Sequence, residues 1–137
     1  MNRIMIGSLA AALVVGLAMA ASPAPAEPLD ADEIGPLIVD KTFHGVNERD
    51  EAFWFWHQGG PKEGTFRAKF RNDQDGTVFG QGTWAAREDE ICWTWTSWNN
   101  KRFCYQRFEF DAGELAMTRS DGEVHVGTLT AGNSEGL

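Results

Sequence analysis

Two cysteines, Cys92 and Cys104, are the residues whose chemistry follows most directly from this 137-residue sequence. An even number of cysteines in an exported chain predicts a disulfide, because such chains meet an oxidising compartment. A pair of free buried thiols is one alternative, and a metal site is another. The spacing is too wide for a CxxC redox motif, and no histidine stands within a dozen residues of either cysteine. We therefore expect a disulfide and no metal ion.

Aromatic side chains form a second group of residues that could bind a ligand. The chain has six Trp, nine Phe and one Tyr, and Phe and Trp alternate over 53–56, so both faces of a strand there would be aromatic. Trp98 falls at a predicted loop tip, and aromatic residues on such surfaces bind sugars, apolar ligands or other proteins. For the other tryptophans, packing in the core of a small barrel is the favoured alternative. The candidate ligand-binding residues are Trp54, Trp56, Trp93, Trp95, Trp98 and Tyr105.

The remaining polar residues give no argument for an enzyme. His44, His57 and His125 lie far apart in the sequence, and none has a neighbour at ligand spacing, so each is expected to be solvated or singly hydrogen-bonded. Asp73-x-Asp75-Gly76 resembles the start of a calcium loop but lacks its later ligands, and predicts a hairpin turn instead. Nucleophile, zinc-protease, phosphate-loop and dinucleotide motifs are missing from the sequence. We expect no cofactor.

The first 26 residues predict a secretory signal peptide. Arg3 is their only charged residue, an apolar run follows it, and the segments 18–20 and 24–26 both fit a small-x-small cleavage site. An uncleaved membrane anchor is the alternative, since the run is about as long as a short spanning helix. The apolar run is rich in Ala and Gly, which makes it a weak membrane-spanning segment, so we favour a cleaved signal peptide. We expect a periplasmic or secreted protein with no membrane span after cleavage.

The chain that follows the signal peptide is acidic. Arg3 is one of twelve basic residues, so residues 27–137 carry 11 Lys and Arg against 20 Asp and Glu, a formal charge of −9. Nucleic acid and anionic membranes are poor partners for such a chain. A basic protein is one alternative partner, but the favoured interpretation is that the acidity keeps a secreted protein soluble. This length fits one domain, for which a disulfide contributes about 3 kcal/mol by chain entropy.

Period-two alternation and turn residues predict an all-β domain over 41–137. The preceding residues, 27–40, predict a linker and a short helix that begins at Asp30, with Glu33 placed to complete a capping box and Pro36 limiting its length. Short strands with mostly short links indicate an antiparallel meander that forms a closed or half-open barrel. The eight expected strands are 41–46, 52–57, 65–71, 77–85, 91–96, 102–110, 114–118 and 123–130.

The disulfide predicts the register of one hairpin. If the two cysteines lie directly opposite, Trp93 faces Phe103 and Thr94 faces Arg102. Asn99 or Asn100 would then take a left-handed conformation in the turn. Because Phe108 and Phe110 are out of phase with Tyr105, we expect a bulge near 106–107. The residues expected on the core face are Ile91, Trp93, Trp95, Phe103 and Tyr105.

The segment 75–133 carries a G-x-W at Gly82-Thr83-Trp84, then Ile91-Cys92-Trp93-x-Trp95, and a second cysteine ahead of a last hairpin. In these features it resembles a group of small, uncharacterised exported proteins of Gram-negative bacteria. The G-x-W is also similar to that of lipocalin-like and avidin-like barrels, although it falls on the fourth expected strand and not the first. These similarities imply a fold and a compartment, and no activity.

The sequence thus favours a non-catalytic binding module. One hypothesis is a small apolar or sugar-like ligand held in an aromatic-lined barrel mouth or cavity. The alternative is a protein-binding module, such as a periplasmic enzyme inhibitor, that presents its acidic surface and Trp98 to a basic target.

Overall fold

The computed structural model describes residues 28–72 and 76–137. The predicted signal peptide at 1–26 lies outside these residues, as do positions 73–75 of the predicted hairpin turn. In the described ranges, no helix combines the length and apolarity that a bilayer span requires.

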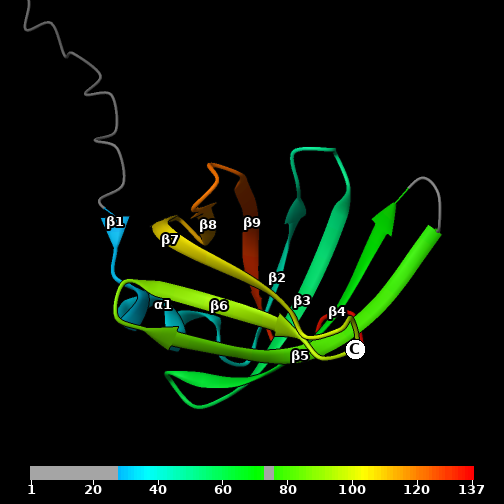
Figure 1. Ribbon diagram of the computed structural model, residues 1–137, viewed down its shortest axis with the longest axis horizontal. Coiled ribbons are helices and arrows are strands. Elements are labelled where there is room, and N and C mark those ends of the chain that lie inside the picture. Colours follow the sequence, from blue (N-terminus) through cyan, green and yellow to red (C-terminus); the bar gives the residue numbers. More distant parts are fainter. Residues whose placement is uncertain (1–27, 73–75) are drawn as a thin grey trace, which may run out of the picture.

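Eight antiparallel strands form a closed barrel, which confirms the predicted meander (Figure 1). Each strand pairs with its neighbours in sequence, and the last closes back onto the first, because β9 pairs with both β2 and β8. The two-residue strand β1 (Pro28–Leu29) pairs with β7 beyond the end of β6. The barrel strands are β2 (Lys41–Val46), β3 (Ala52–Gly59), β4 (Glu63–Asn72), β5 (Gly76–Arg87), β6 (Glu90–Trp95), β7 (Lys101–Asp111), β8 (Glu114–Arg119) and β9 (Val124–Ala131).

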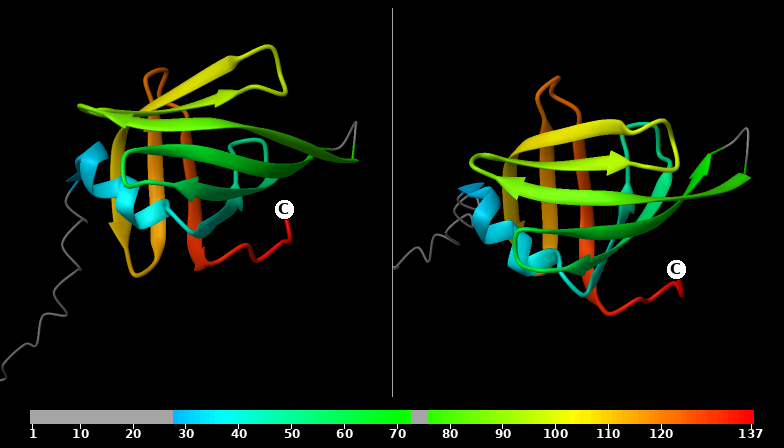
Figure 2. Two further views of the ribbon diagram at one scale, coloured as in Figure 1. Left: turned by 90° about the horizontal axis from the view of Figure 1, so that it is seen from below. Right: turned by 60° about the horizontal axis from the view of Figure 1, so that its bottom comes forward.

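The helix α1 (Ala31–Ile38) begins where the sequence predicts it. The Asp30 N–H donates to a carboxylate oxygen of Glu33 at 3.2 Å, one of the bonds of a capping box. The helix lies across one end of the barrel (Figure 2) and buries Ile34 and Ile38 there. This end is where the β3–β4 and β5–β6 hairpins turn.

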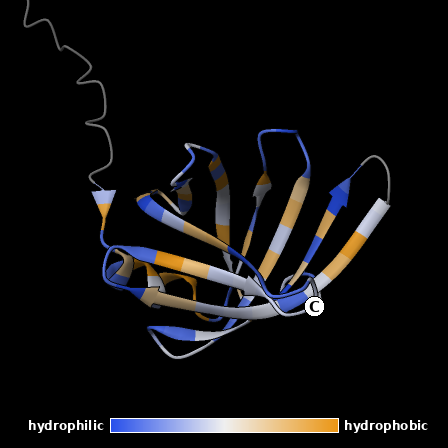
Figure 3. Ribbon diagram, viewed as in Figure 1, coloured by the Kyte–Doolittle hydropathy of each residue, from blue (hydrophilic) through white to orange (hydrophobic). Residues whose placement is uncertain are grey.

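Alternation along the strands separates a packed interior from a polar exterior, as the banding in Figure 3 illustrates. Phe53 and Phe55 face inward, and Trp54 faces outward on the same strand; the pattern over 53–56 predicts the two opposite faces, and the structure shows which one is inside. One contiguous cluster fills the barrel and extends to α1. Its largest members include Phe43, Phe53, Phe66, Trp84, Trp93, Trp95, Tyr105 and Phe108.

Two glycines on β5 allow this dense packing. A Cβ at Gly82 would lie 1.8 Å from the Thr94 carbonyl oxygen, and a Cβ at Gly80 would lie 2.4 Å from the Trp95 ring. The chain therefore approaches its neighbours closely at these two glycines, and this makes room for a large indole inside a small barrel.

The hairpin of β6 and β7 has the predicted register. Cys92 lies opposite Cys104 and is bonded to it, and the core face is buried apart from Phe103, which is half-buried. Asn99 and Asn100 both have positive φ, at 48° and 54°. The register of β7 against β8 shifts between 105 and 107, so the predicted bulge is also confirmed.

Candidate binding site at the barrel mouth

The end of the barrel opposite α1, here called the mouth, is surrounded by the loops 47–51, 96–100 and 120–123. Antiparallel connectivity brings these loops together, because alternate hairpins turn at the same end. The last inward-facing residues before this end come from six different strands. They are Phe53, Phe70, Trp95, Phe103, Arg119 and His125.

Trp98 is the most exposed aromatic residue of the mouth, with 48% of its surface accessible. Its ring contacts Trp95 edge-on at 6.4 Å between centroids and lies 6.3 Å from Phe103. The Lys101 ammonium sits 4.0 Å from the centroid of the Trp98 ring, a cation–π contact. Arg119 lies 5.2 Å from the Phe103 ring. Aromatic rings and cations therefore alternate across the mouth, and we call Trp98, Lys101, Phe103 and Arg119 the mouth cluster.

A hydrogen-bonded network lies beside this cluster. The Tyr105 hydroxyl is 2.9 Å from Nδ1 of His125, and Nε2 of His125 is 3.1 Å from a carboxylate oxygen of Glu123. Burial raises the pKa of Tyr105, so its hydroxyl stays protonated. His125 bridges the Tyr105 hydroxyl and the Glu123 carboxylate through its two ring nitrogens. The network orients side chains and offers no ionised hydroxyl as a nucleophile.

Arg119 is held by two acidic side chains. It donates to Asp121 through Nε at 3.0 Å and Nη2 at 2.7 Å, and its Nη2 also contacts a Glu123 carboxylate oxygen. Hydrogen bonding to Asp121 raises the pKa of Arg119. The same bond lowers the pKa of Asp121 to about 2. The positive charge of Arg119 is thus largely neutralised by Asp121 and Glu123. Lys101, by contrast, forms no ion pair within residues 28–72 and 76–137.

The predicted ligand-binding residues separate into three places. Trp95, Trp98 and Tyr105 lie at or next to the mouth, and Trp93 lies deeper in the core, 4% exposed. Trp54 and Trp56 face outward from β3 and belong to a different surface. The structure therefore brings four of the six residues to the mouth end and interior, and leaves two outside.

Both outward-facing tryptophans are covered by neighbours. The Trp54 ring stacks on His44 at 4.7 Å, with the Lys69 ammonium 4.7 Å from the same ring. Trp56 is 9% exposed, and the C-terminal segment crosses this face. Ser134 donates its N–H to Oγ1 of Thr42 on β2, and Glu135 pairs with Lys69 on β4. Neither indole presents a free face to a ligand.

Arg119, Glu123 and His125 are site residues that the sequence interpretation missed. They surround the Ser120-Asp121-Gly122 turn. His125 was expected to be solvated or singly hydrogen-bonded, but it contacts both Tyr105 and Glu123. Arg119 ends β8, Glu123 belongs to the following turn, and His125 lies on β9, so their closeness follows from one tight turn, whereas the inward direction of Arg119 and His125 depends on which face of the sheet is inside the barrel.

The candidate metal ligands of the described residues are Glu90, Cys92 and Cys104. Both sulfurs are joined in the disulfide, and metal binding requires thiolates, so this group fits no ion in its oxidised form. Two shallow surface depressions lie at the α1 end, away from the mouth cluster. They are lined by residues 60–63 and 86–87, and by residues 87–90 and 106.

No family model matches the chain, and no curated protein matches it. Among solved structures, it is similar to a redesigned β-barrel, with a TM-score of 0.46 and 19% identity over 70% of this chain and 92% of that chain. A de novo designed fluorescence-activating β-barrel gives a TM-score of 0.45 and 18% identity over 75% and 98%. The resemblance to uncharacterised exported proteins therefore stays a prediction.

Proposed function

We propose that this protein is a non-catalytic binding module that holds a small apolar or sugar-like ligand at the barrel mouth. The observation that carries the proposal is the half-exposed Trp98 ring, fixed between Trp95, Phe103 and the Lys101 ammonium. Exposing a large apolar ring without a ligand forgoes hydrophobic stabilisation. Barrel mouths are common places for ligand sites, where a few polar groups accompany aromatic walls.

The mouth is favoured over an interior cavity because large side chains occupy the barrel interior. A ligand ring would stack on Trp98, and the Lys101 ammonium would donate to a ligand oxygen. The protein would do this outside the cytosol, in the periplasm or after secretion, since its disulfide is typical of an oxidising compartment.

The test is a titration of the folded protein with indole, cellotriose and chitotriose, followed by tryptophan fluorescence and melting temperature. We expect at least one probe to bind, and Trp98→Ala to weaken its binding about tenfold, the loss typical of an aromatic anchor. Phe79→Ala is the matched control, because Phe79 is also an exposed aromatic residue (69%) but faces outward from β5. Equal binding by the Trp98 and control variants would refute the mouth site.

A protein partner is the second candidate. Val46, Val124 and Val126 are 50%, 37% and 38% exposed, and Val46 lies opposite Val126 in the β2–β9 register. An exposed apolar patch on an acidic protein fits a basic protein, for example a secreted enzyme that it would inhibit. Capture of such an enzyme by the wild type and its loss with Val126→Asp would support this candidate.

A further inference from the structure

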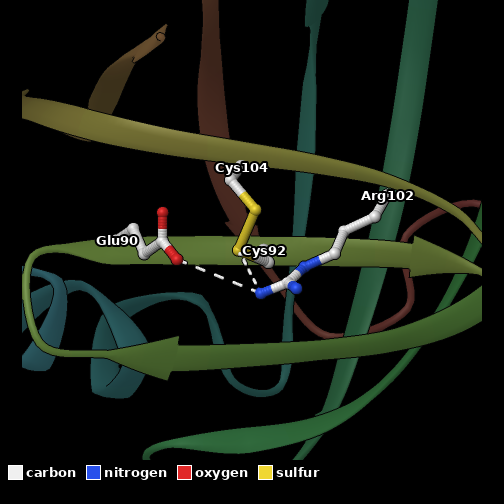
Figure 4. The surroundings of a disulfide bond; sticks show 4 residues. All are labelled: Glu90, Cys92, Arg102 and Cys104. Atoms are coloured by element: carbon white, nitrogen blue, oxygen red, sulfur yellow. Dashed lines mark hydrogen bonds and ion pairs between the residues drawn. A yellow bond between two sulfur atoms is a disulfide. The ribbon is translucent and has the colours of Figure 1, made fainter.

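The disulfide lies on the outer face of the barrel, apart from the mouth cluster, with a cation at one of its two sulfurs (Figure 4). Nη2 of Arg102 is 3.2 Å from Sγ of Cys92. The same nitrogen is 3.9 Å from a Glu90 carboxylate oxygen. Arg102 lies two residues before Cys104, on the same face of β7, and its side chain reaches diagonally across the hairpin to Cys92 on β6. The two sulfurs therefore have different electrostatic surroundings.

The two sulfurs also differ in access. Cys92 is 6% exposed and lies between paired strands, with Ala85 of β5 on one side and Cys104 on the other. Cys104 is half-buried. The pairing of β7 with β8 begins only at Tyr105, so no strand of the described chain flanks Cys104 on the side away from Cys92. Cys104 is therefore the more exposed of the two cysteines and the one that an external nucleophile reaches more readily.

We propose that the Cys92–Cys104 bond is a thiol–disulfide exchange site that a small external thiol opens at Cys104. The thiolate attacks Sγ of Cys104 and forms a mixed disulfide there. The S–S bond breaks, and its electron pair passes to Sγ of Cys92, which leaves as a thiolate beside the Arg102 guanidinium. A second external thiolate then attacks the outer sulfur of the mixed disulfide. This step releases the Cys104 thiolate and the oxidised external disulfide, so two external thiols reduce one protein disulfide.

Arg102 determines the direction of this exchange. Exchange is faster when the departing sulfur is stabilised as a thiolate, and a neighbouring arginine provides that stabilisation. The departing sulfur is Cys92 only if Cys104 is attacked, so access and electrostatics favour the same outcome. Glu90 partly neutralises the guanidinium, and its carboxylate also lies within 4.8 Å of both sulfurs, so it moderates the effect of Arg102.

The experiment treats the folded, oxidised protein with glutathione at neutral pH, quenches with acid and maps the adduct by mass spectrometry of peptides. We expect glutathione on Cys104 and a rate proportional to glutathione concentration. Arg102→Gln should lower the second-order rate constant about five- to tenfold through the poorer leaving group. Glu90→Gln should react at least as fast as the wild type.

Arg107→Gln is the matched control on the same strand. Arg107 is 62% exposed and paired with a 38% exposed Glu109, against 60% for Arg102 and 38% for Glu90, but it has no sulfur contact. Its rate should stay within about twofold of the wild type. Three outcomes would overturn the proposal: glutathione mainly on Cys92, equal rates for the Arg102 and Arg107 variants, or a rate independent of glutathione concentration. The last outcome would mean that unfolding precedes attack.

Discussion

His57 is a neutral imidazole enclosed in the barrel interior. It is 1% exposed, and its Nε2 accepts a hydrogen bond from the Trp93 indole N–H at 3.0 Å. Nδ1 therefore carries the ring hydrogen, and it has no hydrogen-bond partner among the described residues. Burial lowers the pKa of His57 to about 4, an effect partly offset by the Lys41 backbone. The imidazole was expected to be solvated or singly bonded, and it is singly bonded.

This histidine predicts a loss of stability in mild acid. The unfolded pKa is 6.5 and the folded value is about 4, so the unfolded state takes up a proton first as the pH falls through this window. The free energy of unfolding should drop by about 3 kcal/mol between neutral pH and pH 4 from this group. Urea unfolding at several pH values measures it.

Two variants separate the contribution of His57 to the pH dependence of stability from the contribution of the titrating carboxylates. His57→Gln retains an acceptor for Trp93 and should show a shallower fall in stability with decreasing pH than the wild type. His44→Gln, at an exposed position, should keep the wild-type fall. An unchanged pH dependence in His57→Gln would contradict the assignment.

At the scale of elements, β5 and the β6–β7 hairpin show how local residues determine packing. The inward face of β5 carries Gly80 and Gly82 close to the large Trp95 side chain of β6, and Gly82 lies opposite Trp95 in the register. Two asparagines with left-handed backbone conformation and the disulfide fix the geometry of the hairpin. The glycines, the asparagines and the disulfide all act between residues that are close in sequence.

Gly82→Ala should destabilise the barrel by about 2 kcal/mol, because the new Cβ would lie 1.8 Å from the Thr94 carbonyl oxygen and force β5 away from β6. Gly60→Ala is the control, since the nearest atom to its Cβ would be 3.9 Å away. Chemical denaturation of both variants tests the difference. Equal stabilities would show that β5 has room to adjust.

Removing the disulfide with Cys92→Ala and Cys104→Ala together should cost about 3 kcal/mol, because the unfolded chain gains the freedom of a loop between cysteines 12 residues apart. Urea unfolding of the double variant, compared with the oxidised wild type, gives this value. A difference near zero would mean that the hairpin register is already fixed by its turn and its aromatic pairs.

At the scale of the whole molecule, the helix and the closing strand pair complete the barrel. The pairing of β2 with β9 closes the meander into a barrel. The pairing of β7 with β8 continues the sheet across the bulge. The helix covers one end, where Gly35 packs so closely that a Cβ would lie 1.9 Å from the Pro61 carbonyl oxygen. The other end stays available for the mouth cluster, which gives the molecule one covered end and one candidate binding end.

Ile34→Ala should destabilise the whole domain by about 3 kcal/mol, because Ile34 is fully buried between α1 and the barrel. The loss should appear in a single unfolding transition if helix and barrel fold together. Val46→Ala, at a half-exposed position, serves as the control and should change stability little. A separate early transition for the Ile34 variant would indicate that α1 detaches on its own.

The sequence by itself predicted the eight barrel strands, the helix start, the disulfide, the hairpin register and the bulge at 106–107, but not the two-residue strand β1. The disulfide follows from the even number of cysteines in an exported chain. The other features follow from alternation, turn residues or phase shifts among near neighbours, and these local preferences agree with the final fold. The exposed position of Trp98 was predictable for the same reason.

Only the tertiary structure decided which aromatic face is inside, and which charged residues meet. Alternation places Trp54 and Trp56 on one face but does not say that this face is outside, or that residues 132–135 cross it. The Tyr105–His125–Glu123 network joins β7, β9 and the turn between β8 and β9, and it depends on the pairing of β7 with β8 and of β8 with β9. Such contacts depend on strand order and curvature, which are properties of the whole sheet and are not encoded in the spacing of any single segment.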